Sequence, residues 1–184
     1  AGANLVICAR RVQNLEELKN EIDTEVLVLP IDVTSEESVL GFFSEVRNSI
    51  GSADILINNA GTSDPKRFKD LDEESWNYVL ETNLNGAYRV AKNFTDSLIQ
   101  DNKSGSIVNI ASILGLRVGL NLTSYATAKA GLVQLTKSMA LELARSNIRV
   151  NAIAPGYILT EINDDFFATE EGQSYIKNIP MNRL

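Results

Sequence analysis

The 184-residue chain is 44% hydrophobic and 22% charged, which is typical of one soluble globular domain with its own core. Its net charge of -7 argues against nucleic acid or an anionic membrane surface as the main partner, and no apolar run is long enough to span a bilayer. The absence of histidine excludes Ser-His triads and His-ligated metals, so we expect no metal site, and the single cysteine, Cys8, fits a reducing, cytoplasmic location.

Short apolar runs rich in β-branched residues are predicted to form strands. They are Asn4–Cys8, Glu25–Ile31, Asp54–Asn58, Ser106–Ile110 and Arg149–Ile153. Most of them lack strict alternation of polar and apolar residues. This pattern is expected when helices cover both faces of a parallel sheet.

Longer stretches with helical periodicity lie between these strands. They are Leu15–Ile22, Ser35–Ile50, Glu73–Gln100 and Ser124–Ser146. The sequence Thr34-Ser-Glu-Glu37 is a capping box that predicts the start of the second helix. The alternation of strands and helices predicts a doubly wound, mostly parallel α/β sheet of the Rossmann type, as a single domain over residues 1–184.

The helix predicted at Ser124–Ser146 is apolar over much of its circumference. A helix of this kind is usually buried on more than one side. Because its own sheet covers only one side, we expect a homo-oligomer. A core helix within a larger domain is the alternative interpretation.

Both ends of the chain lack elements that a doubly wound dinucleotide fold contains. Ala1-Gly2-Ala3 leads directly into a strand, and Pro180-Met-Asn-Arg-Leu184 ends without a closing strand. Such folds normally begin with a strand and a Gly-rich turn over the pyrophosphate, and we expect this fold to lack that first strand with its turn as well as the last strand. We therefore expect a partial sequence of a longer enzyme; a short variant that binds cofactor weakly is the alternative.

Tyr125-Ala-Thr-Ala-Lys129 is the most informative motif. Tyr and Lys at i and i+4 lie on one helical face, where an ammonium can lower the pKa of a phenol and make it a proton donor and acceptor. Ser112 follows the strand Ser106–Ile110, and a glycine-containing loop allows the chain to fold back toward Tyr125. A solvated helix face is the alternative for any such Tyr and Lys pair.

Tyr88 and Lys92 form a second pair with the same spacing, and Ser75 precedes them as Ser112 precedes Tyr125. Ser75 and Tyr88 lie in one continuous helical pattern, which would place them about 20 Å apart. No small substrate spans that distance. The second pair is therefore predicted to be helix surface or packing.

Other polar residues end the strands or interrupt a helix. Asp32-Val33 follows the second strand and Asn58-Asn-Ala-Gly61 ends the third, at the edge of an open α/β sheet where ligands bind. Asn83 lies within a helical pattern, and Pro155-Gly-Tyr-Ile-Leu-Thr160 follows the last strand. Each of these features taken alone could be a turn, a cap or a solvent-facing residue.

Taken together and in this order, these motifs closely resemble the classical short-chain dehydrogenase/reductase family. Within that family, Glu161–Ile179 resembles the lid region of gluconate-type sugar-acid dehydrogenases and 3-oxoacyl-carrier-protein reductases. The resemblance implies a Rossmann-type fold and a nicotinamide dinucleotide. It also implies hydride transfer that interconverts a carbonyl and a secondary alcohol on a small molecule, and a homotetramer.

The same resemblance implies a role for each site residue. Tyr125 would be the catalytic acid and base, Lys129 its partner and a ribose ligand, Ser112 the anchor of the substrate oxygen, and Asn83 the holder of a relay water. Asp32 and Val33 would contact the adenine. The cofactor-binding set as a whole is Ala9, Arg10, Asp32, Val33, Asn59, Ala60, Gly61, Tyr125, Lys129, Pro155, Gly156, Ile158 and Thr160.

We expect NADP(H) to be the cofactor, with NAD(H) also possible. In dinucleotide folds an acidic residue after the second strand holds the ribose 2′-hydroxyl and would repel a 2′-phosphate. The matching position here is Ala9, followed by Arg10 and Arg11, and a guanidinium suits bidentate phosphate binding. A pair of surface arginines at a strand end is the alternative.

Two other functions remain open at this point. A non-catalytic nucleotide-binding or interaction protein would account for the missing Gly-rich turn, but not for the complete set of Asn83, Ser112, Tyr125 and Lys129. A sugar-nucleotide epimerase or dehydratase also uses Tyr and Lys at this spacing. The Asn-Asn-Ala-Gly motif and the lack of a substrate domain disfavour the latter.

Overall fold

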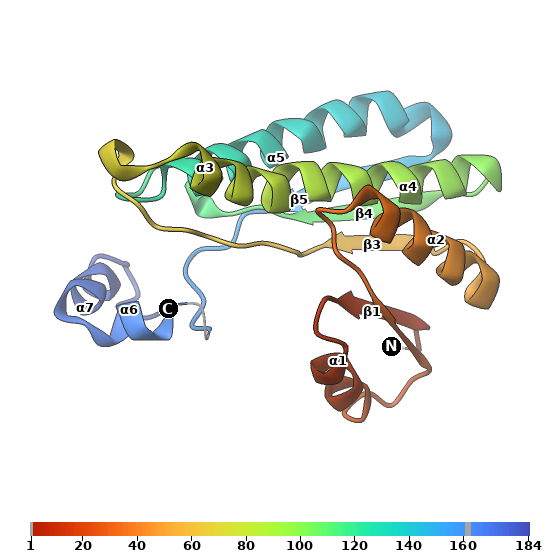
Figure 1. Cartoon of the computed structure of the whole chain (residues 1–184), viewed down its shortest axis with the longest axis horizontal. Coiled ribbons are helices and arrows are strands. Elements are labelled where there is room, and N and C mark those ends of the chain that lie inside the picture. Colours follow the sequence, from red (N-terminus) through yellow and green to blue (C-terminus); the bar gives the residue numbers. More distant parts are fainter. Residues whose placement is uncertain (1, 161–162) are drawn as a thin grey trace.

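The computed structural model describes residues 2–160 and 163–184 and contains two parallel sheets (Figure 1). In the first, β1 (Leu5–Ala9) pairs with β2 (Val26–Pro30). The second has the order β3-β4-β5, made of β3 (Ile55–Asn58), β4 (Gly105–Ile110) and β5 (Ile148–Ile153). The predicted parallel α/β class is confirmed, and each observed strand overlaps a predicted one.

Each predicted helix overlaps an observed one, but the stretch predicted as one helix at Glu73–Gln100 contains two helices, and two further helices that were not predicted follow the last strand. The observed helices are α1 (Val12–Lys19), α2 (Glu36–Ile50), α3 (Glu73–Leu80), α4 (Gly86–Gln100), α5 (Thr123–Leu143), α6 (Asp164–Ala168) and α7 (Glu170–Lys177). Short 3₁₀ turns at Phe68–Asp70, Ile113–Gly115 and Ala144–Ser146 were not predicted. Within the described residues, no helix has the length and apolar character needed to cross a membrane.

The predicted capping box at Thr34 is wrong by one residue. Thr34 Oγ1 donates to Asp32 Oδ1 at 2.7 Å, and the Thr34 amide donates to the same oxygen at 2.9 Å. Ser35 is the N-cap of α2 instead, and its Oγ accepts a hydrogen bond from the Ser38 amide at 3.2 Å. Asp32 thus engages Thr34 in a local turn, and the neighbouring serine satisfies the free amide of the helix.

The sheet of β3, β4 and β5 is covered on one face. Ile107, Ile148 and Val150 point from β4 and β5 into a core with Phe94 and Leu98 of α4. Figure 1 shows α4 and α5 on this side of the sheet.

The opposite face of this sheet carries exposed isoleucines. Ile55, Ile57 and Ile153 are all more than half exposed. The expectation that helices cover both faces is therefore wrong for this sheet within the described residues, because α1 packs on β1 and β2 instead.

The two separate sheets agree with the predicted doubly wound fold that lacks its first strand. Within residues 2–160 and 163–184, β1 is hydrogen-bonded only to β2, and β3 only to β4. No described strand lies between β1 and β3, so each has one edge of unpaired backbone groups.

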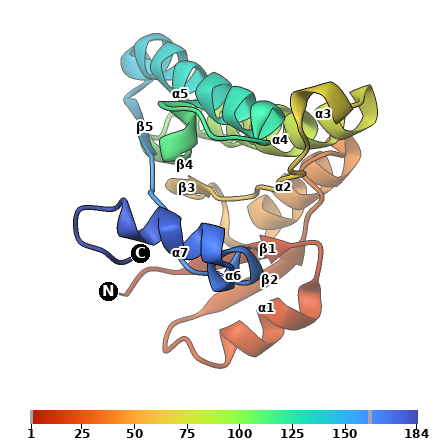
Figure 2. The ribbon, with the colours of Figure 1, turned by 90° about the vertical axis from the view of Figure 1, so that its left-hand side faces the viewer.

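The segment after β5 forms a small aromatic cluster of its own. Phe167 is buried and packs edge-to-face with Tyr157 and Phe166, while Tyr175 contacts Tyr157 and Phe166. These rings hold α6 and α7 together at the end of the molecule that faces the viewer in Figure 2. Two residues of the predicted lid, 161 and 162, lie outside the described part of the chain.

Candidate active site

A buried chain of polar side chains fixes the carboxyl ends of β3 and β4 against the helices. Asn58 Nδ2 donates to the carbonyl of Ala87 at 3.1 Å and to Asn109 Oδ1 at 3.0 Å. Asn109 Nδ2 donates to Thr136 Oγ1 of α5 at 2.9 Å. Sequence reasoning missed Asn109 and Thr136; the available signal was an amide within an apolar strand, which must find partners when it is buried.

Asn83 lies in a π-helical segment, Glu81–Asn85, that joins α3 to α4. Its side chain is fully buried, and Nδ2 donates to the carbonyls of Val79 and Thr62, each at 2.8 Å. Oδ1 accepts the Thr62 amide at 3.2 Å. π-helical turns are rare and occur often at functional sites. Because both amide hydrogens are engaged, a water at this side chain would have to donate to Oδ1.

Gly61 allows the chain after β3 to approach Asn83 closely. A Cβ added at Gly61 would lie 2.9 Å from Asn83 Oδ1 and 3.6 Å from Lys129 Nζ. Gly61, Asn83 and Lys129 therefore converge at one point, although they come from three separate elements. A side chain at position 61 would fill this space.

Lys129 is buried near the start of α5, with only 4% of its surface exposed. Its Nζ donates to the carbonyl of Ile110 at 2.8 Å and lies 5.7 Å from the centre of the Tyr125 ring. Burial lowers the pKa of Lys129 to about 8. The amine is thus held beside the phenol by the last residue of β4.

Ser112 is the buried N-cap of the 3₁₀ turn that follows β4, and its Oγ accepts the Leu114 amide at 3.1 Å. Gly115 ends this turn against α5. A Cβ at Gly115 would come within 2.8 Å of the Lys129 carbonyl carbon and oxygen. The chain therefore folds back onto the helix that carries Tyr125 and Lys129, as the glycines in the loop predicted.

The predicted adenosine-binding residues lie at the ends of β1 and β2. Ala9 ends β1, and its carbonyl accepts the Ile31 amide at 3.2 Å. Hydrogen bonds from Thr34 hold the pKa of Asp32 below its usual value, and the nearby Arg10 guanidinium contributes to the same shift. Arg10 directly follows β1, and Asp32 comes two residues after the end of β2, the strand that pairs with β1.

The segment predicted for the nicotinamide end continues from β5. The carbonyl of Pro155 accepts the Ile113 amide at 2.9 Å, which ties this segment to the turn after Ser112. A Cβ at Gly156 would meet nothing within 4 Å, and Ile158 and Thr160 are exposed. Gly156, Ile158 and Thr160 therefore border open space, while Tyr157 between them packs in the aromatic cluster.

The sequence of this chain is similar to those of proteins of a known family. Residues 1–171 match the family model described as short chain dehydrogenase. The chain belongs to the short-chain dehydrogenase family. Its α/β fold and its class, an oxidoreductase, are those that the motifs predicted.

Relatives of this short-chain dehydrogenase include reductases and solved structures. The 3-oxoacyl-[acyl-carrier-protein] reductase FabG of Aquifex aeolicus is 38% identical over 188 residues, which cover 100% of this chain and 75% of that protein. A short-chain type dehydrogenase/reductase from Mycobacterium marinum has a TM-score of 0.93 at 29% identity, over 100% of this chain and 73% of the other. An actinorhodin polyketide ketoreductase with NADPH has a TM-score of 0.89 at 30% identity, over 97% and 74% of the two chains.

The second Tyr and Lys pair of this short-chain dehydrogenase lies on the surface of α4. Tyr88 is exposed, and Lys92 pairs with Asp96 on the same exposed helix face. Ser75 is buried in α3, where it accepts a hydrogen bond from Lys66. These residues do not come together as a site, in agreement with the prediction from their spacing.

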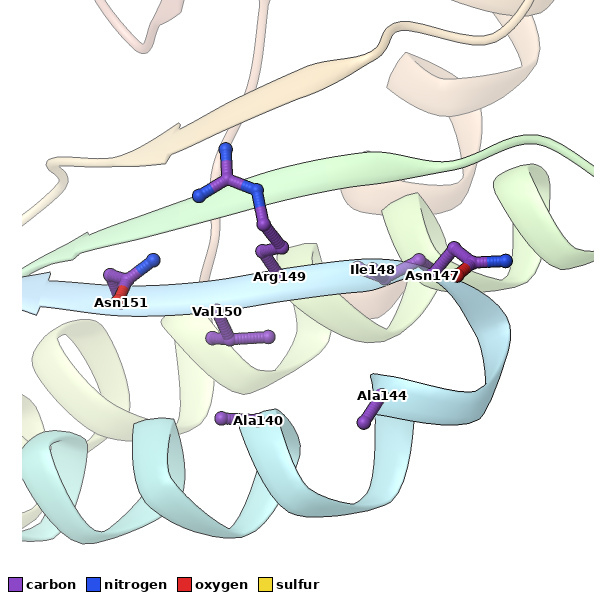
Figure 3. Close-up of a pocket in the computed structure, with 7 residues that line it drawn as sticks. All are labelled: Ala140, Ala144, Asn147, Ile148, Arg149, Val150 and Asn151. Atoms are coloured by element: carbon purple, nitrogen blue, oxygen red, sulfur yellow. The ribbon is translucent and has the colours of Figure 1, made fainter.

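A hollow of about 530 Å³ lies away from these site residues, between the end of α5 and the start of β5 (Figure 3). Ala140 of α5 and Val150 of β5 face each other there, while Arg149 points to the opposite face of the sheet. The lining offers no acid or base beside Arg149. In this short-chain dehydrogenase, the hollow is an open groove beside the edge of β5.

Proposed function

We propose that the protein uses NADP(H) to interconvert a carbonyl and a secondary alcohol on a small molecule, with Asn83, Ser112, Tyr125 and Lys129 as its catalytic residues. The observation that carries this proposal is the convergence of buried Lys129 with Gly61 and Asn83, beside the turn that begins at Ser112. The reductase and ketoreductase names of the relatives support the same chemistry. The single cysteine is consistent with a cytoplasmic location.

The residues present fit the two ends of a nicotinamide dinucleotide. At the adenosine end, Arg10 and Asp32 follow the paired strands β1 and β2, and Val33 comes directly after Asp32. At the other end, the space in front of Gly61 is one that a Cβ would fill, and it is bordered by Lys129. The other predicted cofactor-binding residues after β3 and β5 are exposed: Asn59, Ala60, Gly156, Ile158 and Thr160. When bound, such a cofactor supplies or accepts the hydride.

The proton chemistry follows from the hydrogen bonds of the site. Ser112 Oγ accepts from the Leu114 amide, which leaves its own hydrogen available to donate to a substrate oxygen as negative charge develops there. Tyr125 donates the proton to that oxygen. With its pKa near 8, Lys129 is mainly charged at pH 7, and a positive charge beside a phenol favours loss of the phenol proton.

We expect NADPH to be consumed when a small 3-oxoacyl thioester such as acetoacetyl-CoA is added, with one hydroxyl product formed per NADPH. Absorbance at 340 nm and product analysis measure both quantities. If the protein binds NADPH but reduces neither this compound nor a panel of ketones, the non-catalytic alternative is favoured. If it binds no dinucleotide, the proposed function is rejected.

We expect Arg10→Ala to lower the preference for NADP(H) over NAD(H) about tenfold in kcat/KM, because one charge-assisted contact to the 2′-phosphate would be lost. The effect should lie mainly in KM for NADPH. Arg11→Ala is the matched control, since Arg11 is exposed at the N-cap of α1. An unchanged preference in Arg10→Ala, or a wild type that prefers NAD(H), would contradict the assignment.

We also propose that the protein forms a homotetramer through surfaces that include α5. The fully buried residues of α5 lie toward its own sheet and the Ser112 turn, while Leu141 is 80% exposed on the same helix. Burial of such an exposed apolar side chain in an interface between subunits would be favourable. Light scattering is expected to give a tetramer, and Leu141→Glu should shift the mass downward. A monomeric wild type would exclude the proposal.

A further inference from the structure

Glu81 and Arg89 form an ion pair outside the proposed catalytic set. Glu81 is the first residue of the π-helical segment, and Arg89 lies in the first turn of α4. Arg89 Nη2 donates to Glu81 Oε1, and the two side chains are only 26% and 34% exposed. The pair therefore spans the turn that contains Asn83.

The same guanidinium reaches the loop after β2. Arg89 Nη1 donates to the carbonyl of Val33 at 3.3 Å. The Val33 side chain packs on the same part of α4, because a Cβ added at Gly86 would lie 2.7 Å from Val33 Cγ2. Main chain and side chain of Val33 are thus both held against the helix.

Glu81 in turn has a second partner within the π-helical segment. Its Oε2 accepts a hydrogen bond from Asn85 Nδ2 at 2.5 Å. The hydrogen bonds from Asn85 and then from Arg89 lower the pKa of Glu81, so the carboxylate is charged at neutral pH. A charged Glu81 fixes the orientation in which Arg89 faces Val33.

An ordinary surface ion pair on the same helix provides the contrast. Lys92 and Asp96 are each 55% exposed and contact each other at the i, i+4 spacing within α4. Exposed ion pairs of this kind contribute little to the stability of the fold. Arg89 differs because it joins two elements that are distant in sequence.

We infer that Arg89, held by Glu81, is a positioning residue for the adenosine end of the cofactor. Arg89 fixes the Asp32-Val33 loop to the helix turn that carries Asn83. The same side chain therefore positions both the loop that would contact the adenine and the turn that holds a proposed catalytic residue. This inference rests on the proposed function. The Asp32 carboxylate accepts hydrogen bonds from Thr34, and the Asp32 amide donates to Ser38 Oγ. Side chain and main chain of Asp32 are thus both held in place.

The test compares ligand binding in Arg89→Ala, Arg89→Lys and Glu81→Gln, with Lys92→Ala as the matched control. Calorimetry measures the Kd for NADPH and for 5′-AMP, which occupies only the adenosine end. Arg89→Ala is expected to raise both values about tenfold, since a charged hydrogen bond to the loop is lost. Arg89→Lys should recover part of this loss, and Lys92→Ala should change neither Kd.

Two further measurements distinguish a local effect of Arg89 on the adenosine end from a general loosening of the fold. KM for the carbonyl substrate should stay within about twofold of wild type in Arg89→Ala. Adding Glu81→Gln to Arg89→Ala should weaken binding little further, because the two residues act as a unit.

A wild type that binds neither ligand rejects the proposed function itself. A wild type that binds both, with Arg89→Ala equally tight, overturns only the role of Arg89. An equal rise in the Kd for NADPH and in KM for the carbonyl would show general loosening of the fold and would also overturn it.

Discussion

Replacing Tyr125 with phenylalanine is expected to lower kcat about 10³-fold or more, while the Kd for NADPH stays near that of wild type. The change removes one hydroxyl from a half-buried ring and leaves the contact of the ring with Lys129 in place. The proton that the product oxygen requires then has no donor at this position. Steady-state kinetics and calorimetry of the same preparations measure the two quantities.

Tyr88→Phe is the matched control for this substitution. Tyr88 has the same spacing to Lys92 as Tyr125 has to Lys129, but it lies on the exposed face of α4. Its loss is expected to change kcat less than twofold. Equal losses in the two variants, or a larger loss for Tyr88→Phe, would show that the active site has been assigned to the wrong tyrosine.

Activity is expected to fall as the pH rises through about 8, because Lys129 loses its proton there. The stability of the fold should change in the opposite direction. The pKa of Lys129 is about 8 in the folded protein and 10.5 is its ordinary value, so between these pH values the unfolded chain binds more protons. The free energy of unfolding should therefore rise through this window, by about 3 kcal/mol from this residue.

Lys129→Met is the variant that tests this assignment. It should lose most of its activity at every pH, because methionine has neither the positive charge nor the hydrogen-bond donor of Lys129. The rise in unfolding free energy between pH 8 and 10.5 should be smaller than in wild type, as measured by urea denaturation. A decline in wild-type activity that parallels a loss of stability would instead indicate unfolding and would contradict the role of Lys129.

Local sequence patterns predicted the strands and the approach of Ser112 to the helix of Tyr125 and Lys129. Strand ends, the i, i+4 spacing and the loop glycines depend on residues close together in the chain. The helix boundaries differ from the predicted ones: α1 begins at Val12 instead of Leu15, and the capping serine is one residue beyond the predicted threonine.

The π-helical turn at Glu81–Asn85 was not predictable in the same way. The pattern from Glu73 to Gln100 is that of one continuous helix. At this interruption, Asn83 forms hydrogen bonds with Thr62 in a distant loop, and Arg89 in the next turn donates to the carbonyl of Val33. Contacts across such separations leave no periodic signal in the sequence.

Within residues 2–160 and 163–184, the sheet face that carries Ile55 and Ile57 is exposed and one edge of β3 is unpaired, and both features affect how copies of this chain associate. Unpaired strand edges can template pairing with another chain, and here Ile55 and Ile57 stand beside such an edge. The net charge of -7 opposes this association through repulsion between copies. At 0.1 M ionic strength the Debye length is about 10 Å, so salt screens the repulsion between copies beyond that distance. We therefore expect the chain to associate more readily as the ionic strength rises.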